Sequence, residues 1–301
     1  MAFQQSADGD RNVPLNAPGS AGVLPPDAIM NPARITPEER SEGLIPPIPV
    51  PESDGQSAAT LHFGSWLENT EHNVLSDYRN YYSWTTAREL AMGVGVAGIM
   101  ANTRLDQDFR NWDQQHARNS STNHFADAVR DFGGGWYTVP AFAAMDLLGE
   151  TFDDHPCMAV MGDFGDRTLR AYAVGAPPML LMQELLGSSR PADSGTLSHW
   201  EPFHASNGVS GHAFMGSVPF ITAANMTDNI WAKCGLYVCS TFTGWSRLND
   251  DKHYLSQVCL GWWMGYLACQ AVDGTQRANR HFFVEPLVSP DMTGIGITYQ
   301  H

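Results

Sequence analysis

Proline is unevenly distributed along this chain of 301 residues, and the distribution limits what each part can fold into. Ten of the nineteen prolines lie in the first 51 residues, including Pro25-Pro26 and four in the run from Pro46 to Pro51. Proline lacks a backbone N–H and clashes with the preceding helical turn, so this stretch cannot sustain a helix and is expected to be extended. We therefore predict a proline-rich arm over residues 1–60.

Beyond the arm, apolar residues recur at helical spacing through most of the chain. Helices are expected, in chain order, over residues 80–102, 105–116, 123–132, 140–148, 167–186, 212–226, 230–243 and 254–272. Residues 282–299 alternate β-branched side chains with proline and glycine, which indicates short extended segments. The predicted fold is all-α, a bundle of six or more helices over residues 61–275, with an extended C-terminal tail over residues 276–301.

The charge and hydropathy of the chain exclude several partners. The formal net charge is −15, from 32 acidic and 17 basic residues, and this field repels nucleic acid and anionic membrane surfaces. The longest apolar runs, residues 171–182 and 258–269, are about a dozen residues long and too short to span a membrane, so we expect a soluble protein without a transmembrane segment. The N-terminus lacks a secretory pattern. The protein is therefore either cytoplasmic or, slightly favoured, exported and periplasmic with its leader removed.

Three groups of residues resemble ligand sets, but we assign them no chemistry and predict no metal site. The five cysteines lack metal-ligand spacing, and four lie in apolar helical stretches where small buried side chains are expected. Asp106, Asp108 and Asp113 point in different directions on one helix, so we expect them on a solvated face. Asp153-Asp154-His155 is interpreted as a loop.

Two short clusters contain the groups that phosphate chemistry needs. Arg190-Pro191 is followed by Ser210-Gly211-His212, and later by Ser246-Arg247 with His253. Guanidinium groups, a serine hydroxyl and a glycine amide can hold an oxyanion, and histidines can move its proton. The Ser-Gly pair also begins an apolar helix, whose N-terminus directs N–H groups toward an anion. Taken singly, each part has a structural alternative: a surface Arg-Pro, an N-cap serine and an incidental loop histidine.

In order and spacing, these residues resemble the signature of the type 2 phosphatidic acid phosphatase superfamily, which also contains bacterial acid phosphatases and vanadium-dependent haloperoxidases. That signature is Lys, six residues, Arg-Pro; then Pro-Ser-Gly-His; then Ser-Arg, five residues, His, three residues, Asp. This chain has Gln183, six residues, Arg190-Pro191; then Val209-Ser210-Gly211-His212; then Ser246-Arg247, five residues, His253, three residues, Gln257. The motifs lie between residues 183 and 257, and the helical resemblance covers about residues 80–272.

The resemblance implies a metal-independent phosphoric monoester hydrolase of the acid phosphatase type, acting on a small phosphorylated substrate without a cofactor. His253 would attack phosphorus to form a phosphohistidine, and His212 would protonate the leaving oxygen. The implied phosphate-binding positions are Arg190, Ser210, Gly211, Arg247 and Gln183.

Two positions depart from the family pattern, and both should attenuate activity. Gln183 stands where the family has lysine, which removes a cation from the oxyanion site and should weaken phosphate binding. Gln257 stands where the family has the orienting aspartate. At position i+4 of a helix it still faces His253, and its amide oxygen can accept the ring N–H without bringing a negative charge. Asp250 or Asp251 is an alternative orienting group.

Three functions remain open from the sequence. The first is the phosphatase, with vanadate as an inhibitor. The second is a vanadium-dependent haloperoxidase, in which the position of His253 binds vanadate as a cofactor and that of His212 assists peroxide; Gln183 disfavours it. The third is a non-catalytic family member with an assembly role, forming a homo-oligomer through its N-terminal arm. The identity of the substrate does not follow from the sequence.

Overall fold

The structure, a computed structural model, describes residues 58–192, 198–279, 282–289 and 292–299. The predicted arm lies outside these residues except for positions 58–60, and so does the assembly role assigned to it. The division into arm, helical domain and tail therefore stays a prediction.

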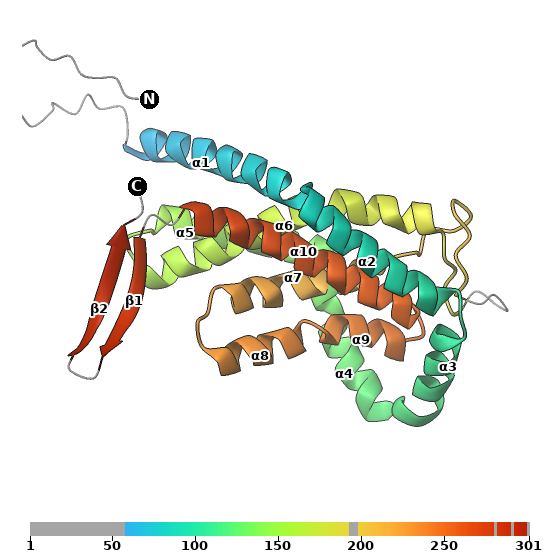
Figure 1. The fold of residues 1–301 in the computed structure, drawn as a ribbon. Coiled ribbons are helices and arrows are strands. Elements are labelled where there is room, and N and C mark those ends of the chain that lie inside the picture. Colours follow the sequence, from blue (N-terminus) through green and yellow to red (C-terminus); the bar gives the residue numbers. More distant parts are fainter. Residues whose placement is uncertain (1–57, 193–197, 280–281, 290–291, 300–301) are drawn as a thin grey trace, which may run out of the picture. The chain divides into compact units, whose positions relative to one another are not determined.

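The described part of the chain is mostly helical, which confirms the predicted all-α fold class (Figure 1). The α-helices are α1 Ala58–Tyr81, α2 Trp84–Ala101, α3 Leu105–Trp112, α4 Ser120–Arg130, α5 Gly135–Thr151, α6 Pro156–Leu186, α7 Gly211–Asn225, α8 Ile230–Cys239, α9 Phe242–Asn249 and α10 Leu255–Asn279. None of the helices in these ranges combines the length and continuous hydropathy that a membrane crossing requires.

The expected extended segments of the tail pair with each other. Strand β1, Phe282–Ser289, runs antiparallel to β2, Met292–Tyr299, with Phe282 opposite Tyr299.

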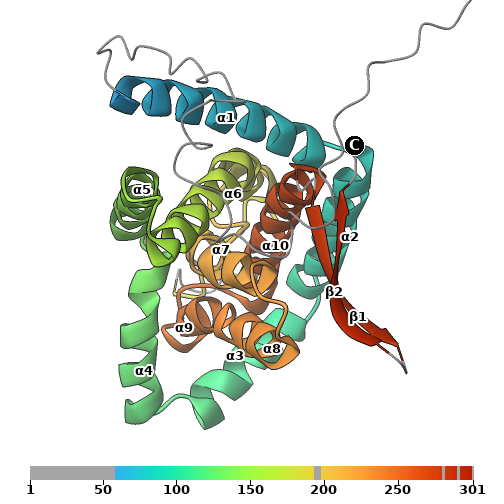
Figure 2. The ribbon, with the colours of Figure 1, turned by 90° about the vertical axis from the view of Figure 1, so that its left-hand side faces the viewer.

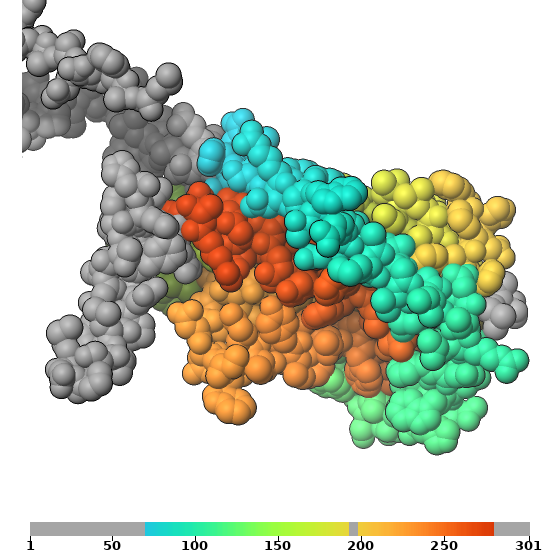
Figure 3. All heavy atoms as spheres, in the orientation of Figure 1, coloured from blue at the N-terminus to red at the C-terminus, as the bar shows by residue number. Residues whose placement is uncertain are grey.

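Helices α6, α7 and α10 pack against one another and form the centre of the bundle (Figure 2). Their contact is apolar, with Val174, Phe214 and Met264 fully buried. Helix α10 approaches the start of α7 closely, because a Cβ at Gly261 would clash with the carbonyl oxygen of Ser210. On the opposite side α10 is covered by α2 (Figure 3). This packing fixes the two helix starts that carry the Ser-Gly-His and His253 motifs.

Helix α1 was not predicted; buried polar contacts help to hold it, in addition to the buried ring of Tyr81. The carboxylate of Asp77 receives two hydrogen bonds from Arg170 of α6, at 2.7 and 2.9 Å, and both side chains are buried. Asn80 donates to the Thr275 hydroxyl at 2.9 Å and so joins α1 to α10. The spacing of apolar residues in the sequence does not predict contacts between polar side chains.

The predicted helix over residues 230–243 is two helices. Helix α8 ends at Cys239, and Ser240 turns its hydroxyl to the Tyr237 carbonyl at 2.6 Å. Helix α9 then starts at Phe242 and includes Arg247.

The expected solvent exposure is wrong for Asp106 and Asp113 and right for Asp108, and the expected burial of the cysteines is right only for Cys269 in the described residues. Asp106 is fully buried, and its carboxylate accepts hydrogen bonds from the N–H and hydroxyl of Ser256, at 2.9 and 2.5 Å. It thereby caps the first turn of α10, while burial raises its pKa. Asp113 is also buried. Of the five cysteines, Cys269 is buried, while Cys239 is half-buried and the others are exposed.

Substitution of Asp77 by alanine should strongly destabilise the fold. The change leaves the buried Arg170 guanidinium with Asp166 as its remaining carboxylate partner, so the free energy of unfolding should fall by about 3 kcal/mol. Urea denaturation followed by circular dichroism measures this change. The matched control is Arg277→Ala, which breaks an i,i+4 pair at a 70% exposed arginine and should cost less than about 1 kcal/mol. Equal losses of unfolding free energy in the two variants would contradict the structural role of the Asp77–Arg170 pair.

Candidate active site

The three motif segments meet at the starts of α7 and α10. The N–H of Ser210 donates to the carbonyl of Gln257 at 2.9 Å, which ties α7 to the first turn of α10. The side chain of Gln183, on the last turn of α6, donates to the carbonyl of Val209 at 2.9 Å. The structure therefore brings positions 183, 209, 210 and 257 together.

Ser210 and Gly211 stabilise the start of α7 and also present hydrogen-bond donors there. The Ser210 hydroxyl accepts a hydrogen bond from the Ala213 N–H at 3.3 Å, so the residue is an N-cap, and its own proton remains a donor. Gly211 lies close to Gln183, whose amide nitrogen would be 3.4 Å from a Cβ at this position. The N–H groups of this helix start are suited to an anion.

The side-chain amide of Gln257 fixes the tautomer of His253. Its oxygen accepts from the Tyr254 N–H at 3.1 Å, and its nitrogen donates to the Ser189 carbonyl at 2.9 Å, so the orientation of the amide is determined by two backbone groups. The same oxygen lies 2.8 Å from Nδ1 of His253. Nδ1 must therefore carry the proton, and Nε2 keeps its lone pair. The amide nitrogen also donates to the Ser188 hydroxyl at 2.9 Å.

Arg247 and His253 are connected through the main chain. The carbonyl of Arg247 accepts hydrogen bonds from the N–H groups of Lys252 and His253, at 2.9 and 3.3 Å. Asp251 adopts a left-handed conformation, with φ of 56°, which allows the chain to fold back in this way. The guanidinium of Arg247 is buried and donates to Ser246 Oγ at 3.3 Å and to Asp250 at 2.5 Å.

Neither Asp250 nor Asp251 orients His253, so that alternative is wrong. Asp250 pairs with Arg247, and Asp251 receives two hydrogen bonds from Arg110 of α3, each at 2.7 Å. These carboxylates hold the loop between α9 and α10, whereas the neutral amide of Gln257 hydrogen-bonds to the His253 ring.

Arg190 follows the end of α6 and is exposed, with its Nε donating to Asn207 at 2.9 Å. Its charge acts on both histidines. Burial, together with the charges of Arg190, His212 and Arg247, lowers the pKa of His253 to about 4. Burial and the charges of neighbouring arginines, with Arg247 the largest, also lower the pKa of His212 below its ordinary 6.5. Both imidazoles are therefore favoured in the neutral form when no anion is bound.

Residues 174–280 match the family model of the PAP2 superfamily, and the match contains every motif position from 183 to 257. The resemblance to this superfamily that the motifs indicate is therefore confirmed for this segment. The match supports a phosphatase of that superfamily. The chain is also similar to the crystal structure of the first transmembrane PAP2 type phosphatidylglycerolphosphate phosphatase from Bacillus subtilis, with 14% identity, 72% of this chain and 98% of that chain covered, and a TM-score of 0.44. None of the curated proteins matches the chain.

Several residues around the PAP2 motifs were missed by sequence reasoning. Ser188 and Ser189 hold Gln257 from the end of α6, yet neither stands out in the sequence. The turn after α4 also packs on the site, because a Cβ at Gly133 would lie 2.8 Å from the carbonyl oxygen of His212 and 2.9 Å from its Cβ. Gly133 and Gly134 separate α4 from α5, whose first residue is Gly135. The second role of Gly133, a close approach to His212, depends on a tertiary contact.

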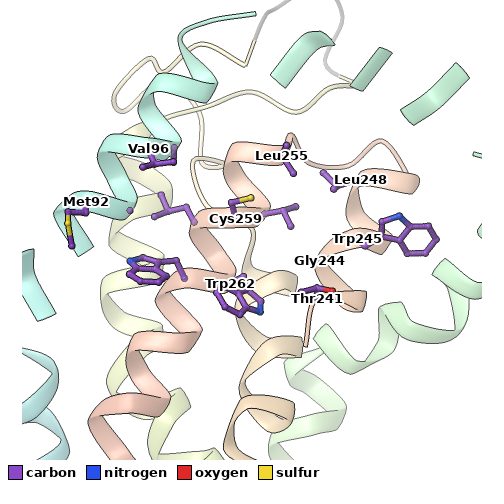
Figure 4. A pocket seen from close by; sticks show the side chains of 14 residues that line it. Met92, Val96, Thr241, Gly244, Trp245, Leu248, Leu255, Cys259 and Trp262 are labelled. Carbon is purple, nitrogen blue, oxygen red and sulfur yellow. The ribbon is translucent and has the colours of Figure 1, made fainter. Parts of the chain in front are cut away.

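The PAP2 motif residues do not line the apolar hollow between α2, α9 and α10. This hollow has a volume of about 700 Å³, and its walls include Met92, Val96, Trp245, Leu255 and Trp262 (Figure 4). Elsewhere in the described residues, no group of three or more His, Cys, Asp or Glu side chains is arranged to hold a metal ion.

Replacing Gln257 by glutamate should raise the pKa of His253 and destabilise the fold. A carboxylate beside the Nδ1–H favours the imidazolium, so the pKa should rise by about one unit or more. The carboxylate cannot donate to Ser188 or Ser189, so the free energy of unfolding should fall by about 1–3 kcal/mol. NMR titration of the His253 ring and urea denaturation measure the two effects.

The matched control for this prediction is Gln107→Glu, which makes the same change in charge where the amide bonds only to Asn111 on the same helix. It should leave the His253 pKa nearly unchanged. An unchanged pKa in the Gln257 variant as well would mean that Nδ1 does not bond to this side chain.

Proposed function

We propose that this protein hydrolyses a phosphomonoester through a phosphohistidine intermediate, without a metal ion. The observation that carries the proposal is the orientation of the Gln257 amide, which requires the proton of His253 on Nδ1 and leaves Nε2 as a nucleophile. The low pKa of this ring, about 4, keeps the lone pair unprotonated over a wide pH range. Arg190 and Arg247 are close enough to shift that pKa, and they supply positive charge for the non-bridging oxygens.

The proposed reaction has two displacements at phosphorus. In the first, Nε2 of His253 forms a bond to phosphorus while the bond to the leaving oxygen breaks, and His212 in its protonated form gives its proton to that oxygen. In the second, neutral His212 takes a proton from water, the water oxygen bonds to phosphorus and the P–N bond breaks. The hydroxyl of Ser210 and the N–H of Gly211 join the guanidinium groups in stabilising the additional charge of each transition state.

The two glutamines are expected to attenuate this reaction. Gln183 offers amide N–H groups, one of which is already donated to Val209, and no positive charge. Gln257 orients the ring of His253 but does not stabilise the imidazolium as a carboxylate would. The proposed enzyme is consequently a weaker phosphatase than one with lysine and aspartate at these positions.

The central test is hydrolysis of p-nitrophenyl phosphate by the purified protein and by His253→Ala. The wild-type protein should release phosphate and be inhibited by vanadate, a mimic of the five-coordinate transition state, whereas the variant should lose the activity. The control is His116→Ala, at an exposed histidine of the turn Asp113–Ala117, which should retain it. Activity that survives loss of His253 would refute the mechanism. Halide oxidation with vanadate and peroxide, in place of hydrolysis, would identify a haloperoxidase.

The pH dependence of kcat/KM should be bell-shaped and centred in the acid range, as in an acid phosphatase. His253 must be neutral to attack, so kcat/KM falls as the pH drops through its pKa, about 4. His212 must be protonated to donate, so kcat/KM also falls as the pH rises through its pKa, which lies below 6.5. Rates measured from about pH 3 to about pH 8 test this window. A maximum above neutral pH would contradict these assignments.

A further inference from the structure

The end of α4 forms a wall of the site to which no motif residue contributes. The turn after this helix lies against His212, through Gly133, and the carbonyl of Val129 accepts a hydrogen bond from Thr243 of α9 at 3.1 Å. Thr243 stands one helical turn before Arg247. The last turn of α4 is therefore attached both to the proposed general acid and to the helix of the buried arginine.

Arg130, the last residue of α4, lies between these two attachments. It follows Val129 directly and precedes Gly133 by three positions. Its positive charge acts on both His212 and Arg247. Gln183, which lies close to Gly211, provides no such positive charge.

The partners of Arg130 are replaceable. Its guanidinium pairs with Asp127 at 3.0 Å and with Asp131 at 3.5 Å, and the three side chains are 43%, 60% and 72% exposed. Ion pairs at this degree of exposure are worth about 0–1 kcal/mol. A phosphate dianion, with twice the charge and several acceptor oxygens, is a stronger partner for a guanidinium than either carboxylate.

We propose that Arg130 is a third substrate-binding cation, whose guanidinium leaves Asp127 and Asp131 to contact the phosphate oxygens beside His212. In this role it supplies the charge that the neutral Gln183 does not. The proposal rests on the proposed function, because it takes the anion to be the phosphate group of the substrate. The two carboxylates hold the empty guanidinium in place and reduce its repulsion of Arg247.

The test combines Arg130→Gln with Gln183→Lys in a double-mutant cycle. Arg130→Gln should lower kcat/KM for p-nitrophenyl phosphate, and weaken inhibition by inorganic phosphate, each by roughly 10- to 100-fold. Arg88→Gln, which removes an exposed arginine of α2, controls for the change in net charge and should alter both by less than about twofold. Adding Gln183→Lys should restore most of the loss in the Arg130→Gln background and gain much less in the wild type.

A second readout separates this proposal from the phosphatase proposal. Binding of inorganic phosphate, measured by calorimetry at constant ionic strength, does not require turnover. Weaker binding in Arg130→Gln than in Arg88→Gln supports the role of Arg130 even if hydrolysis is absent, which would refute only the proposed function. Equal binding and equal kcat/KM in these two variants, or strictly additive effects in the cycle, would overturn the inference while leaving the phosphatase intact.

The variant Arg130→Lys distinguishes the loss of positive charge from a loss of folding stability. It retains the charge, and it should keep more phosphate affinity than Arg130→Gln at the same midpoint of urea denaturation. If the lysine and glutamine variants bind phosphate equally, the charge of residue 130 is not used.

Discussion

The site depends on one buried side chain, the amide of Gln257. Its oxygen receives the ring N–H of His253 and the backbone N–H of Tyr254, and its nitrogen donates to Ser188 and Ser189. The backbone carbonyl of the same residue holds Ser210. Every polar atom of the side chain is thus engaged, and it is fully buried. The end of α6 and the starts of α7 and α10 are joined at this residue, because only an amide can accept and donate there simultaneously.

Two carboxylates near His253 hold helices together and do not orient its ring. Asp106 caps the start of α10, and Asp251 binds Arg110, so α3 supports the segment that contains His253 from outside. Burial of the His253 ring, together with the positive charges of Arg190, His212 and Arg247, lowers its pKa, and the hydrogen bond to Gln257 opposes this only in part. In a protein of net charge −15, such local positive charge is what attracts a small anion to one place.

The sequence motifs, in their order and spacing, grouped residues 183, 190, 210–212, 247, 253 and 257 as one candidate site. Helical periodicity located α2, α7 and the start of α10 to within a few residues. It missed α1, which is held by the Asp77–Arg170 pair, and it misjudged Asp106, because a carboxylate that caps another helix has the same local pattern as a solvated one. Contacts between polar groups of distant segments are fixed by tertiary packing, so no local pattern reveals them.

The return of the chain onto the carbonyl of Arg247 has a consequence for how such a site diversifies. Because that oxygen receives the N–H groups of Lys252 and His253, the main chain itself sets the spacing between Arg247 and His253, the proposed nucleophile. These two residues therefore lie on one short segment, whereas other parts of the surroundings come from other helices such as α4. Side chains on those helices could change which molecules are admitted while the spacing between Arg247 and His253 stays constant. Novel specificities can then arise without rebuilding the chemistry.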